Sequence, residues 1–161
     1  MTEPAYAELH CISNYSFLRG ASHPEELVLR ASELGYSAIA VTDECSMAGV
    51  VKAHMAAIEC GIKLIVGSEF RLENSVVDCP GKPVHIVLLA PTRVAYGQIC
   101  NLITIGRRRG EKGEYDLSLK DLEIGLSECL AIWLPDDAKA RSPHAYRPHT
   151  TSSGNQEHPY A

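Results

Sequence analysis

Residues 38–50 read Ala-Ile-Ala-Val-Thr-Asp-Glu-Cys-Ser-Met-Ala-Gly-Val, and residues 61–70 repeat the pattern as Gly-Ile-Lys-Leu-Ile-Val-Gly-Ser-Glu-Phe. In each stretch a short apolar run ends at a carboxylate, Asp43 or Glu69. A strand of a parallel sheet is covered on both faces, so it is apolar throughout and the first acid marks its end. Because the carboxyl ends of such strands meet at one edge, we expect Asp43 and Glu69 to be neighbours. Either residue alone is equally consistent with a loop start or a helix cap.

The rest of the chain alternates apolar strand-like runs with amphipathic segments. The predicted strands are residues 6–12, 38–42, 63–66, 84–90 and 129–134, and the predicted helices are residues 22–34, 46–59 and 92–109, with a helical turn at 118–122. Gly35 and Gly61 stand where helices should end. This order predicts an α/β fold with about five parallel strands and flanking helices.

Composition narrows the class of protein. The chain has 161 residues, 45% of them hydrophobic, which suffices for one domain with a core. Its 15 basic and 20 acidic residues give a formal charge of -5, so the whole molecule does not attract nucleic acid. The six cysteines form no Cys-x-x-Cys pair, and no signal peptide or membrane-length apolar run is present. These features predict a cytoplasmic protein with reduced thiols and no membrane contact.

The composition changes after Pro135. Residues 136–161 contain no Ile, Leu, Val, Phe or Met. A segment with so little to bury cannot offset the entropy lost on ordering, so we expect it to be disordered. The predicted division is therefore a folded part, residues 1–135, and a tail, residues 136–161.

Several segments resemble a known family when they are taken together and in order. They are Leu9-His-Cys-Ile-Ser-Asn-Tyr-Ser-Phe-Leu-Arg-Gly20 and residues 40–43, 61–69, 85–90 and 96–103. They resemble the polymerase-and-histidinol-phosphatase (PHP) domain of bacterial C-family DNA polymerases. Residues 16–24, 42–46 and 106–110 are most similar to the error-prone alpha-subunit branch. The resemblance covers residues 5–134 and implies an incomplete, distorted (β/α) barrel.

The resemblance also implies a metal centre, but this sequence keeps only part of it. Active members of the superfamily hold two or three ions with a His-x-His pair, a loop ligand, an Asp-His step, a Glu and later histidines. The positions that match here are His10, Asp43, Glu69 and His85. The substituted positions are Ile12 for the second histidine, Arg19 for the loop ligand and Glu44 for the histidine of the Asp-His step.

These substitutions predict a degenerate site. Ile12 has no ligating atom, and Arg19 brings a fixed positive charge that can take the place of a cation. We expect no multinuclear hydrolytic centre, and at most one weakly bound Zn²⁺, Mn²⁺ or Mg²⁺ held by some of His10, Asp43, Glu44, Glu69 and His85. The alternative for His10 is a structural histidine bonded to a carboxylate such as Glu8 or Glu69.

The one basic cluster is Arg107, Arg108, Arg109 and Lys112. The resemblance implies that such a cluster contacts a DNA backbone or another polymerase domain, without reading sequence. Glu111 and Glu114 dilute its charge, so a solvated helix end is the competing interpretation. We expect the chain alone to bind DNA weakly or not at all.

Three hypotheses about function follow. The first is a PHP segment of an error-prone DNA polymerase that acts in replication and damage-induced mutagenic repair synthesis, with DNA and other polymerase or mutasome subunits as partners. Nothing after Pro135 resembles the family's palm carboxylates, so we expect a truncated chain without nucleotidyl transfer. The second is an independent metal-dependent phosphoesterase of the same superfamily. The third is a nonfunctional remnant of a disrupted gene.

Overall fold

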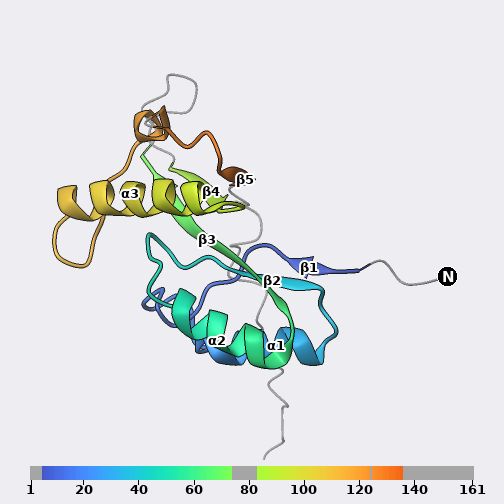
Figure 1. Cartoon of the computed structure of the whole chain (residues 1–161). Helices are drawn as coiled ribbons and strands as arrows, with labels where there is room; N and C mark the ends of the chain where they lie inside the picture. The colour runs from blue at the N-terminus through green and yellow to red at the C-terminus, as the bar shows by residue number, and fades with distance from the viewer. Residues whose placement is uncertain (1–4, 74–82, 124, 136–161) are drawn as a thin grey trace, which may run out of the picture.

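The computed structural model describes residues 5–73, 83–123 and 125–135, which form one curled sheet with helices on its outer side (Figure 1). The strands, in spatial order, are β1 (Ala7–Glu8), β2 (Ala38–Val41), β3 (Lys63–Leu72), β4 (Val84–Leu89) and β5 (Leu130–Leu134). The helices are α1 (Pro24–Glu33), α2 (Val50–Cys60), α3 (Arg93–Arg109) and the 3-10 helix η1 (Leu119–Glu123).

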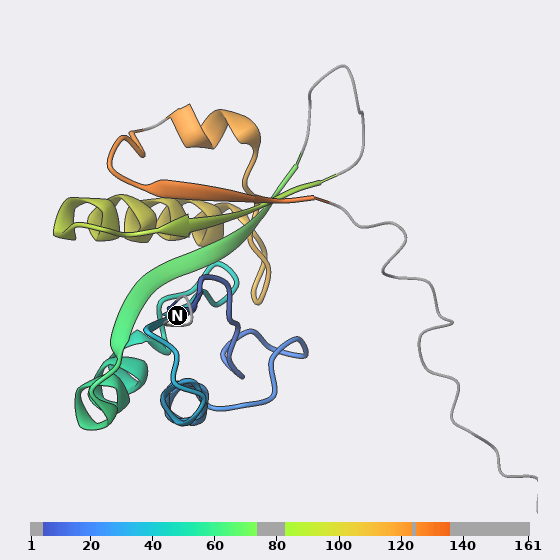
Figure 2. The same ribbon diagram turned by 90° about the vertical axis from the view of Figure 1, so that its right-hand side faces the viewer.

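Strand β3 joins the two halves of the sheet. Its first part pairs in parallel with β2, with Val66 opposite Val41, and its second part pairs antiparallel with β4, with Gly67 opposite Leu89. Figure 2 shows β3 bending from the layer of α1 and α2 toward the layer of α3. Five strands curled into a half-barrel confirm the predicted incomplete barrel.

The direction of β4 differs from the prediction. β4 runs antiparallel to β3, and β5 runs antiparallel to β4, so β4 alone points opposite to the other four strands and the expectation of about five parallel strands was wrong for it. The connection between the two strands, residues 73–83, joins Leu72 at the end of β3 to Val84 at the start of β4, and these two residues are paired. After α3 the chain returns to the start of that helix, where Thr92 donates a hydrogen bond to Glu128. β5 therefore begins beside the end of β4.

Two apolar clusters hold the helices on the outer face of the sheet. α1 and α2 pack against β2 through Val28, Ala31, Ile39, Val41, Ala53 and Ala57. α3 packs against β3 and β4 through Phe70, Leu72, Ile86, Leu88, Ile99 and Leu102. Thr92 caps α3 by accepting a hydrogen bond of 3.1 Å from the backbone N–H of Ala95. These contacts fix the outer face and leave the inner face to form the site.

The inner face is apolar at one end and polar at the other. Ala40, Val87 and Leu89 are buried there, with Ile65, Ile132 and Leu134 packed against them. Side chains alternate along a strand, so Glu69 lies on this inner face while Phe70 faces α3. The strand β3 thus continues past the point where its end was expected, and it carries Glu69 into the half-barrel.

Other expectations concern the ends of the chain. The first strand ends at Glu8 and is shorter than predicted. Farther along the chain, the carbonyl of Cys11 still accepts a 2.7 Å hydrogen bond from the N–H of Thr42. The predicted disorder of residues 136–161 lies outside the described residues. No helix in the described part of the chain has the length and apolarity needed to cross a membrane.

Candidate functional site

Glu69 lies at the centre of the polar end of the inner face, with a side chain only 1% exposed. Its Oε2 is 2.9 Å from Nε2 of His10, which comes from the segment after β1. Nη2 of Arg19 lies 3.0 Å from Oε1 and 3.2 Å from Oε2 of the same carboxylate. Nδ1 of His85, on β4, is 3.6 Å from Oε1. His10, His85 and Arg19 therefore meet at the carboxylate of Glu69.

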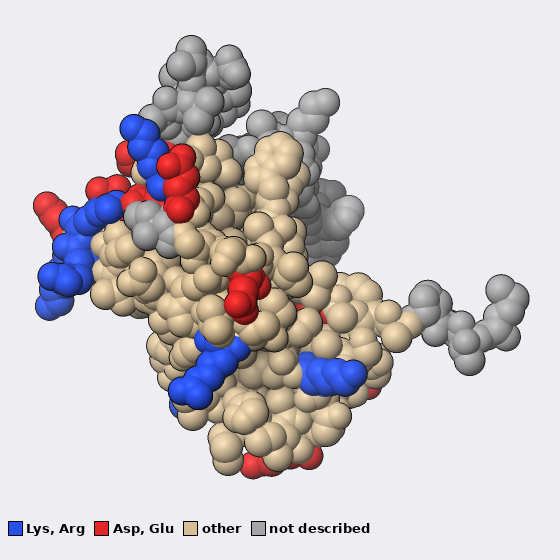
Figure 3. All heavy atoms as spheres, turned by 45° about the horizontal axis from the view of Figure 1, so that its top comes forward, with Lys and Arg blue, Asp and Glu red and all other residues tan. Residues whose placement is uncertain are grey.

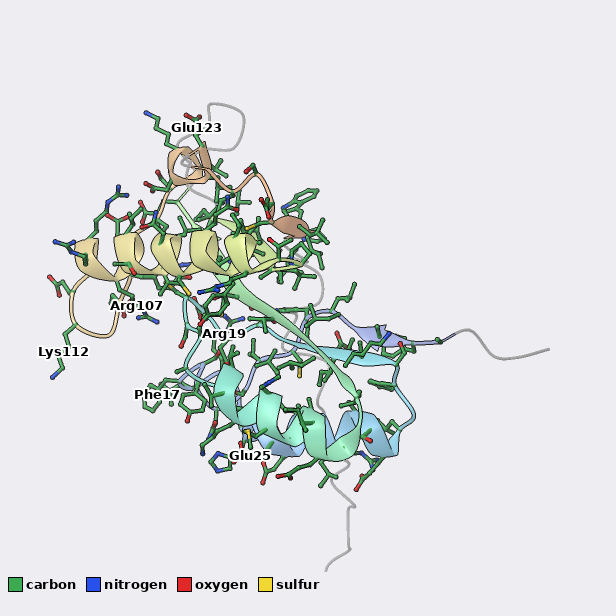
Figure 4. The ribbon with its side chains drawn as sticks, viewed as in Figure 1. Phe17, Arg19, Glu25, Arg107, Lys112 and Glu123 are labelled. Atoms are coloured by element: carbon green, nitrogen blue, oxygen red, sulfur yellow. The ribbon has the colours of Figure 1, made fainter. Side chains whose placement is uncertain are left out.

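Arg19 also contacts a second carboxylate. Its Nη1 lies 2.6 Å from Oε2 of Glu44, so the guanidinium bridges Glu44 and Glu69. The other oxygen of Glu44 accepts a 2.8 Å hydrogen bond from the hydroxyl of Tyr115, and that hydroxyl accepts one of 2.8 Å from the Arg71 N–H. The bridge thus links the loop before α1, the segment after β2, β3 and the segment after α3. Figure 4 shows Arg19 between the layer of α1 and α2 and the layer of α3.

The charges of the bridge stabilise one another. Burial alone would raise the pKa of Glu69, but the hydrogen bonds from His10 and Arg19 outweigh it and hold that pKa at about 2. Burial would lower the pKa of Arg19, and its bonds to Glu69 and Glu44 instead raise it. Burial and the bond to Glu44 raise the pKa of Tyr115. Glu69 is therefore ionised and Tyr115 is a neutral hydrogen-bond donor at neutral pH.

The backbones of Asp43 and Glu69 are in contact, but the carboxylate of Asp43 is bonded elsewhere. The Glu69 N–H donates to the Asp43 carbonyl at 3.2 Å. The buried carboxylate of Asp43 instead accepts hydrogen bonds from Ser13 N–H at 2.7 Å, Ser13 Oγ at 2.8 Å and Ser16 Oγ at 2.7 Å. Asp43 therefore orders the loop that carries Arg19, and its oxygens are occupied by that task.

The donor set does not fit a multinuclear metal centre. A guanidinium already lies between Glu44 and Glu69, where it supplies the positive charge that a cation would bring. Half-buried Ile12 offers no ligand atom. Within the described residues, no three His, Cys, Asp or Glu side chains are placed to hold one ion. His10, Glu69 and His85 are the side chains nearest to such an arrangement.

The basic cluster is divided between inward and outward side chains. Arg107 turns inward, with Nε 3.3 Å from the Cys45 carbonyl and its guanidinium 5.4 Å from the ring centre of Tyr115. Arg109 binds the buried carboxylate of Asp121 at 2.7 Å. Arg108 and Lys112 are exposed. Figure 3 shows that Lys and Arg side chains at the end of α3 are mixed with acidic ones.

Sequence reasoning missed the residues that hold this site in place. Ser13 and Ser16 fix Asp43, and Tyr115 fixes Glu44. A serine three residues from another in a polar loop is a weak signal that these hydroxyls share one acceptor. No local signal marks Tyr115, which lies 71 residues from Glu44 in the sequence.

Comparisons with known proteins identify the family. The PHP domain model matches residues 8–131, which is most of the chain. The chain belongs to the PHP domain family. It is 58% identical over 137 residues to the Error-prone DNA polymerase of Methylococcus capsulatus, covering 84% of this chain and 12% of that protein. The Error-prone DNA polymerase of Teredinibacter turnerae is 55% identical over 131 residues, with coverage of 81% and 12%. This PHP chain is thus homologous to a segment about one eighth as long as those polymerases.

Solved structures support the same fold for this PHP domain. A candidate metal-dependent phosphoesterase from Bifidobacterium adolescentis has a TM-score of 0.51 and 27% identity, covering 65% of this chain and 34% of that protein. An amidohydrolase from Chromobacterium violaceum, solved with sulfate and no metal, has a TM-score of 0.52 and 28% identity, with the same coverage. The half-barrel of this chain therefore corresponds to part of a larger fold in both proteins.

Proposed function

We propose that this PHP domain serves an error-prone DNA polymerase as a structural and docking unit, in which an arginine-centred bridge takes the place of a metal centre. The observation that carries the proposal is the position of Arg19 between Glu44 and Glu69, at 2.6 Å and 3.0 Å. A hydrolytic metal site needs several neutral or anionic donors around an open coordination position. A guanidinium in that place offers positive charge without a Lewis-acid site.

The bridge is suited to a structural role because it joins segments that are distant in sequence. Arg19 lies in the loop before α1, Glu44 follows β2, Glu69 lies in β3, and Tyr115 adds the segment after α3. A buried carboxylate such as Glu69 is costly unless it is paired, so the bridge favours one arrangement of these segments. In the same proposal His10 is a structural partner of Glu69, and a divalent ion binds weakly if it binds there.

Partners of the intact polymerase are part of the proposal. In such a protein, DNA and other polymerase or mutasome subunits would meet the domain, in the cytoplasm. The domain itself would add little to DNA affinity, because Arg107 and Arg109 are engaged within the chain and Glu111 and Glu114 lie beside Lys112. Phosphate contacts from Arg108 and Lys112 alone give a weak, salt-dependent attraction.

A metal-dependent phosphoesterase is the second candidate. It is favoured by the name of the Bifidobacterium adolescentis neighbour and by the meeting of His10, Glu69 and His85 at one place. It requires the guanidinium of Arg19 to leave the carboxylates, which would expose two acidic groups to each other. This cost disfavours it relative to the structural role.

Metal titration combined with a hydrolysis assay separates the two. The chain is titrated with Zn²⁺ and Mn²⁺ by calorimetry, and p-nitrophenyl phosphate and a single-stranded oligonucleotide are offered as substrates. The structural proposal expects no sub-micromolar stoichiometric binding and no turnover above that of a Glu69→Gln variant. Stoichiometric tight binding with metal-dependent turnover that Glu69→Gln abolishes would establish the phosphoesterase instead.

A further inference from the structure

The most exposed large apolar side chains of the described residues are neighbours in one loop. Phe17 is 84% and Leu18 is 89% exposed, and we call the two residues the Phe17–Leu18 knob. Figure 4 shows Phe17 projecting away from the body of the molecule, on the side of Arg107 and Lys112. Single exposed apolar residues are common, so exposure by itself assigns no role.

The loop under the knob is held by a buried network. The Asp43 carboxylate accepts bonds from both Ser13 and Ser16, and the Ser16 carbonyl accepts bonds from the N–H groups of Arg19 and Gly20, each 3.0 Å long. Gly20 has to lack a Cβ, because that atom would lie 1.9 Å from the Ser13 carbonyl oxygen. The knob is therefore presented by an ordered turn with specific sequence requirements.

The backbone of the knob is strained. Leu18 has a φ of 60°, in the left-handed region that residues with a Cβ seldom adopt. Such a conformation persists where surrounding bonds impose it, and it is concentrated at functional sites. Here the strained backbone places an apolar side chain in solvent, where that side chain does not stabilise the chain itself. A partner that covers the knob would account for both features.

The surroundings of the knob indicate the chemistry of that partner. The hollow beside it, of about 300 Å³, is lined by the knob itself and, among others, by Tyr15, Glu44, Arg107, Glu114 and Tyr115. Aromatic side chains and Arg, with polar and charged groups around them, are typical of a protein interface, in which they supply the anchors. A nucleic-acid surface would instead need a positive excess.

The relatives are long enough to supply the partner from their own polypeptide. This chain spans 12% of the Error-prone DNA polymerases of Methylococcus capsulatus and Teredinibacter turnerae, so most of such a polypeptide is available to cover the knob. We propose that, within a full-length polymerase, Phe17 and Leu18 insert into an apolar pocket on another domain of the same polypeptide. The inference rests on the proposed docking role and assigns that role to one loop.

Crosslinking in a full-length chimera tests the proposal. Residues 8–131 of this chain replace the matching segment of the Methylococcus capsulatus polymerase, and p-benzoylphenylalanine is placed at position 17 or, as a control, at position 29 on α1. We expect irradiation to join position 17 to one peptide outside the PHP segment of the same molecule, with at least tenfold less of that product from position 29. Absence of this product, or equal yields from both positions, would overturn the proposal.

Proteolysis of the same chimera measures what the knob contributes. Phe17→Ser with Leu18→Ser is expected to speed cleavage between the PHP segment and the rest of the chimera by about tenfold, whereas Leu29→Ser is not. In the 161-residue chain the same double substitution should change the rate of proteolysis by less than twofold relative to the unsubstituted chain. Both side chains are already exposed there. Equal acceleration in both proteins would show a local folding effect and overturn the proposal.

These outcomes are separable from failure of the proposed function. Metal-dependent phosphoesterase turnover would contradict the structural role of the Arg19 bridge, whether or not position 17 crosslinks. A chimera without turnover, in which the knob neither crosslinks nor protects the junction, would overturn this inference and leave the arginine bridge in place.

Discussion

The guanidinium of Arg19 lies 3.0 Å from the carboxylate of Glu69, whose side chain is almost completely buried. Removing the arginine leaves that carboxylate with only the side chains of His10 and His85 close to it among those that contact it now. We expect Arg19→Ala to lower the free energy of unfolding by about 2 kcal/mol, because a buried charge loses its main partner. Urea unfolding followed by circular dichroism measures the change.

A matched control for Arg19 lies on the surface. Arg30 pairs with Glu33 at 2.9 Å, but both side chains are exposed, so Arg30→Ala should change the free energy of unfolding by less than about 0.5 kcal/mol. Adding Glu69→Gln to Arg19→Ala should recover part of the loss, since the unpaired charge is then gone. Equal losses from Arg19→Ala and Arg30→Ala would contradict a structural role for the bridge.

The bridge also predicts how stability depends on pH. The pKa of Glu69 is about 2 in the folded chain, lower than its ordinary value near 4.5. A carboxylate with a depressed pKa stabilises the fold above its unfolded-state pKa, and this contribution is lost as pH falls toward the folded-state pKa. Stability should therefore decline between about pH 5 and pH 2, by an amount on the order of 2–3 kcal/mol from this group. If the unfolding midpoint of Glu69→Gln depended on pH in the same way as that of the original chain, the assignment of this contribution to Glu69 would be wrong.

Metal affinity should rise when ligands are restored. Ile12→His together with Glu44→His returns two imidazoles to positions where the family resemblance places ligands, and Glu44→His also releases one contact of Arg19. We expect Zn²⁺ to bind this double variant at least tenfold more tightly than the original chain, as measured by calorimetry. The single variant Ile12→His is the control, since it leaves both carboxylates bridged by Arg19. Sub-micromolar binding by the unmodified chain would contradict the prediction.

Tyr115 has a smaller but specific role. Its hydroxyl donates to Glu44 and accepts from the Arg71 N–H, both at 2.8 Å, and the residue is half-buried. We expect Tyr115→Phe to cost about 1 kcal/mol of unfolding free energy, since Glu44 and the Arg71 N–H each lose a hydrogen-bond partner. The exposed Tyr96 offers the comparison, and Tyr96→Phe should be nearly neutral. If the thermal melts of Tyr115→Phe and Tyr96→Phe coincided, the hydroxyl of Tyr115 would have no stabilising role in this network.

The sequence predicted those parts of the fold and the site that depend on local pattern. The apolar runs before Asp43 and Glu69 indicated the central strands, and Arg19 was recognised as a substitute for a cation. The reversal of β4 was not predicted, because an apolar run in the sequence does not show which way its strand will run in the sheet. The separate tasks of Asp43 and Glu69 could not be predicted either, since the first is set by hydroxyls of a distant loop.

The exposed strand β5 leads to a prediction about assembly. Within the described residues β5 pairs only with β4, so its other edge has no strand partner there. Leu130 and Trp133 are 58% and 69% exposed, and β5 contains no charge or proline of the kind that discourages edge pairing. The inner-face residues Ile132 and Leu134 are only partly buried. An apolar edge of this kind favours pairing with another copy.

We therefore expect the 161-residue chain to associate or to unfold without a sharp transition. Complete burial of a side chain such as Ile132 stabilises a fold by about 1.5–3 kcal/mol, against a typical total of only about 5–15 kcal/mol. Sedimentation velocity at several concentrations, with a thermal melt, measures both properties. Trp133→Lys should weaken association about tenfold or more, because it places a charge on the edge and removes an apolar contact. A monodisperse monomer with one cooperative melt would show instead that the edge of β5 is shielded within a single chain.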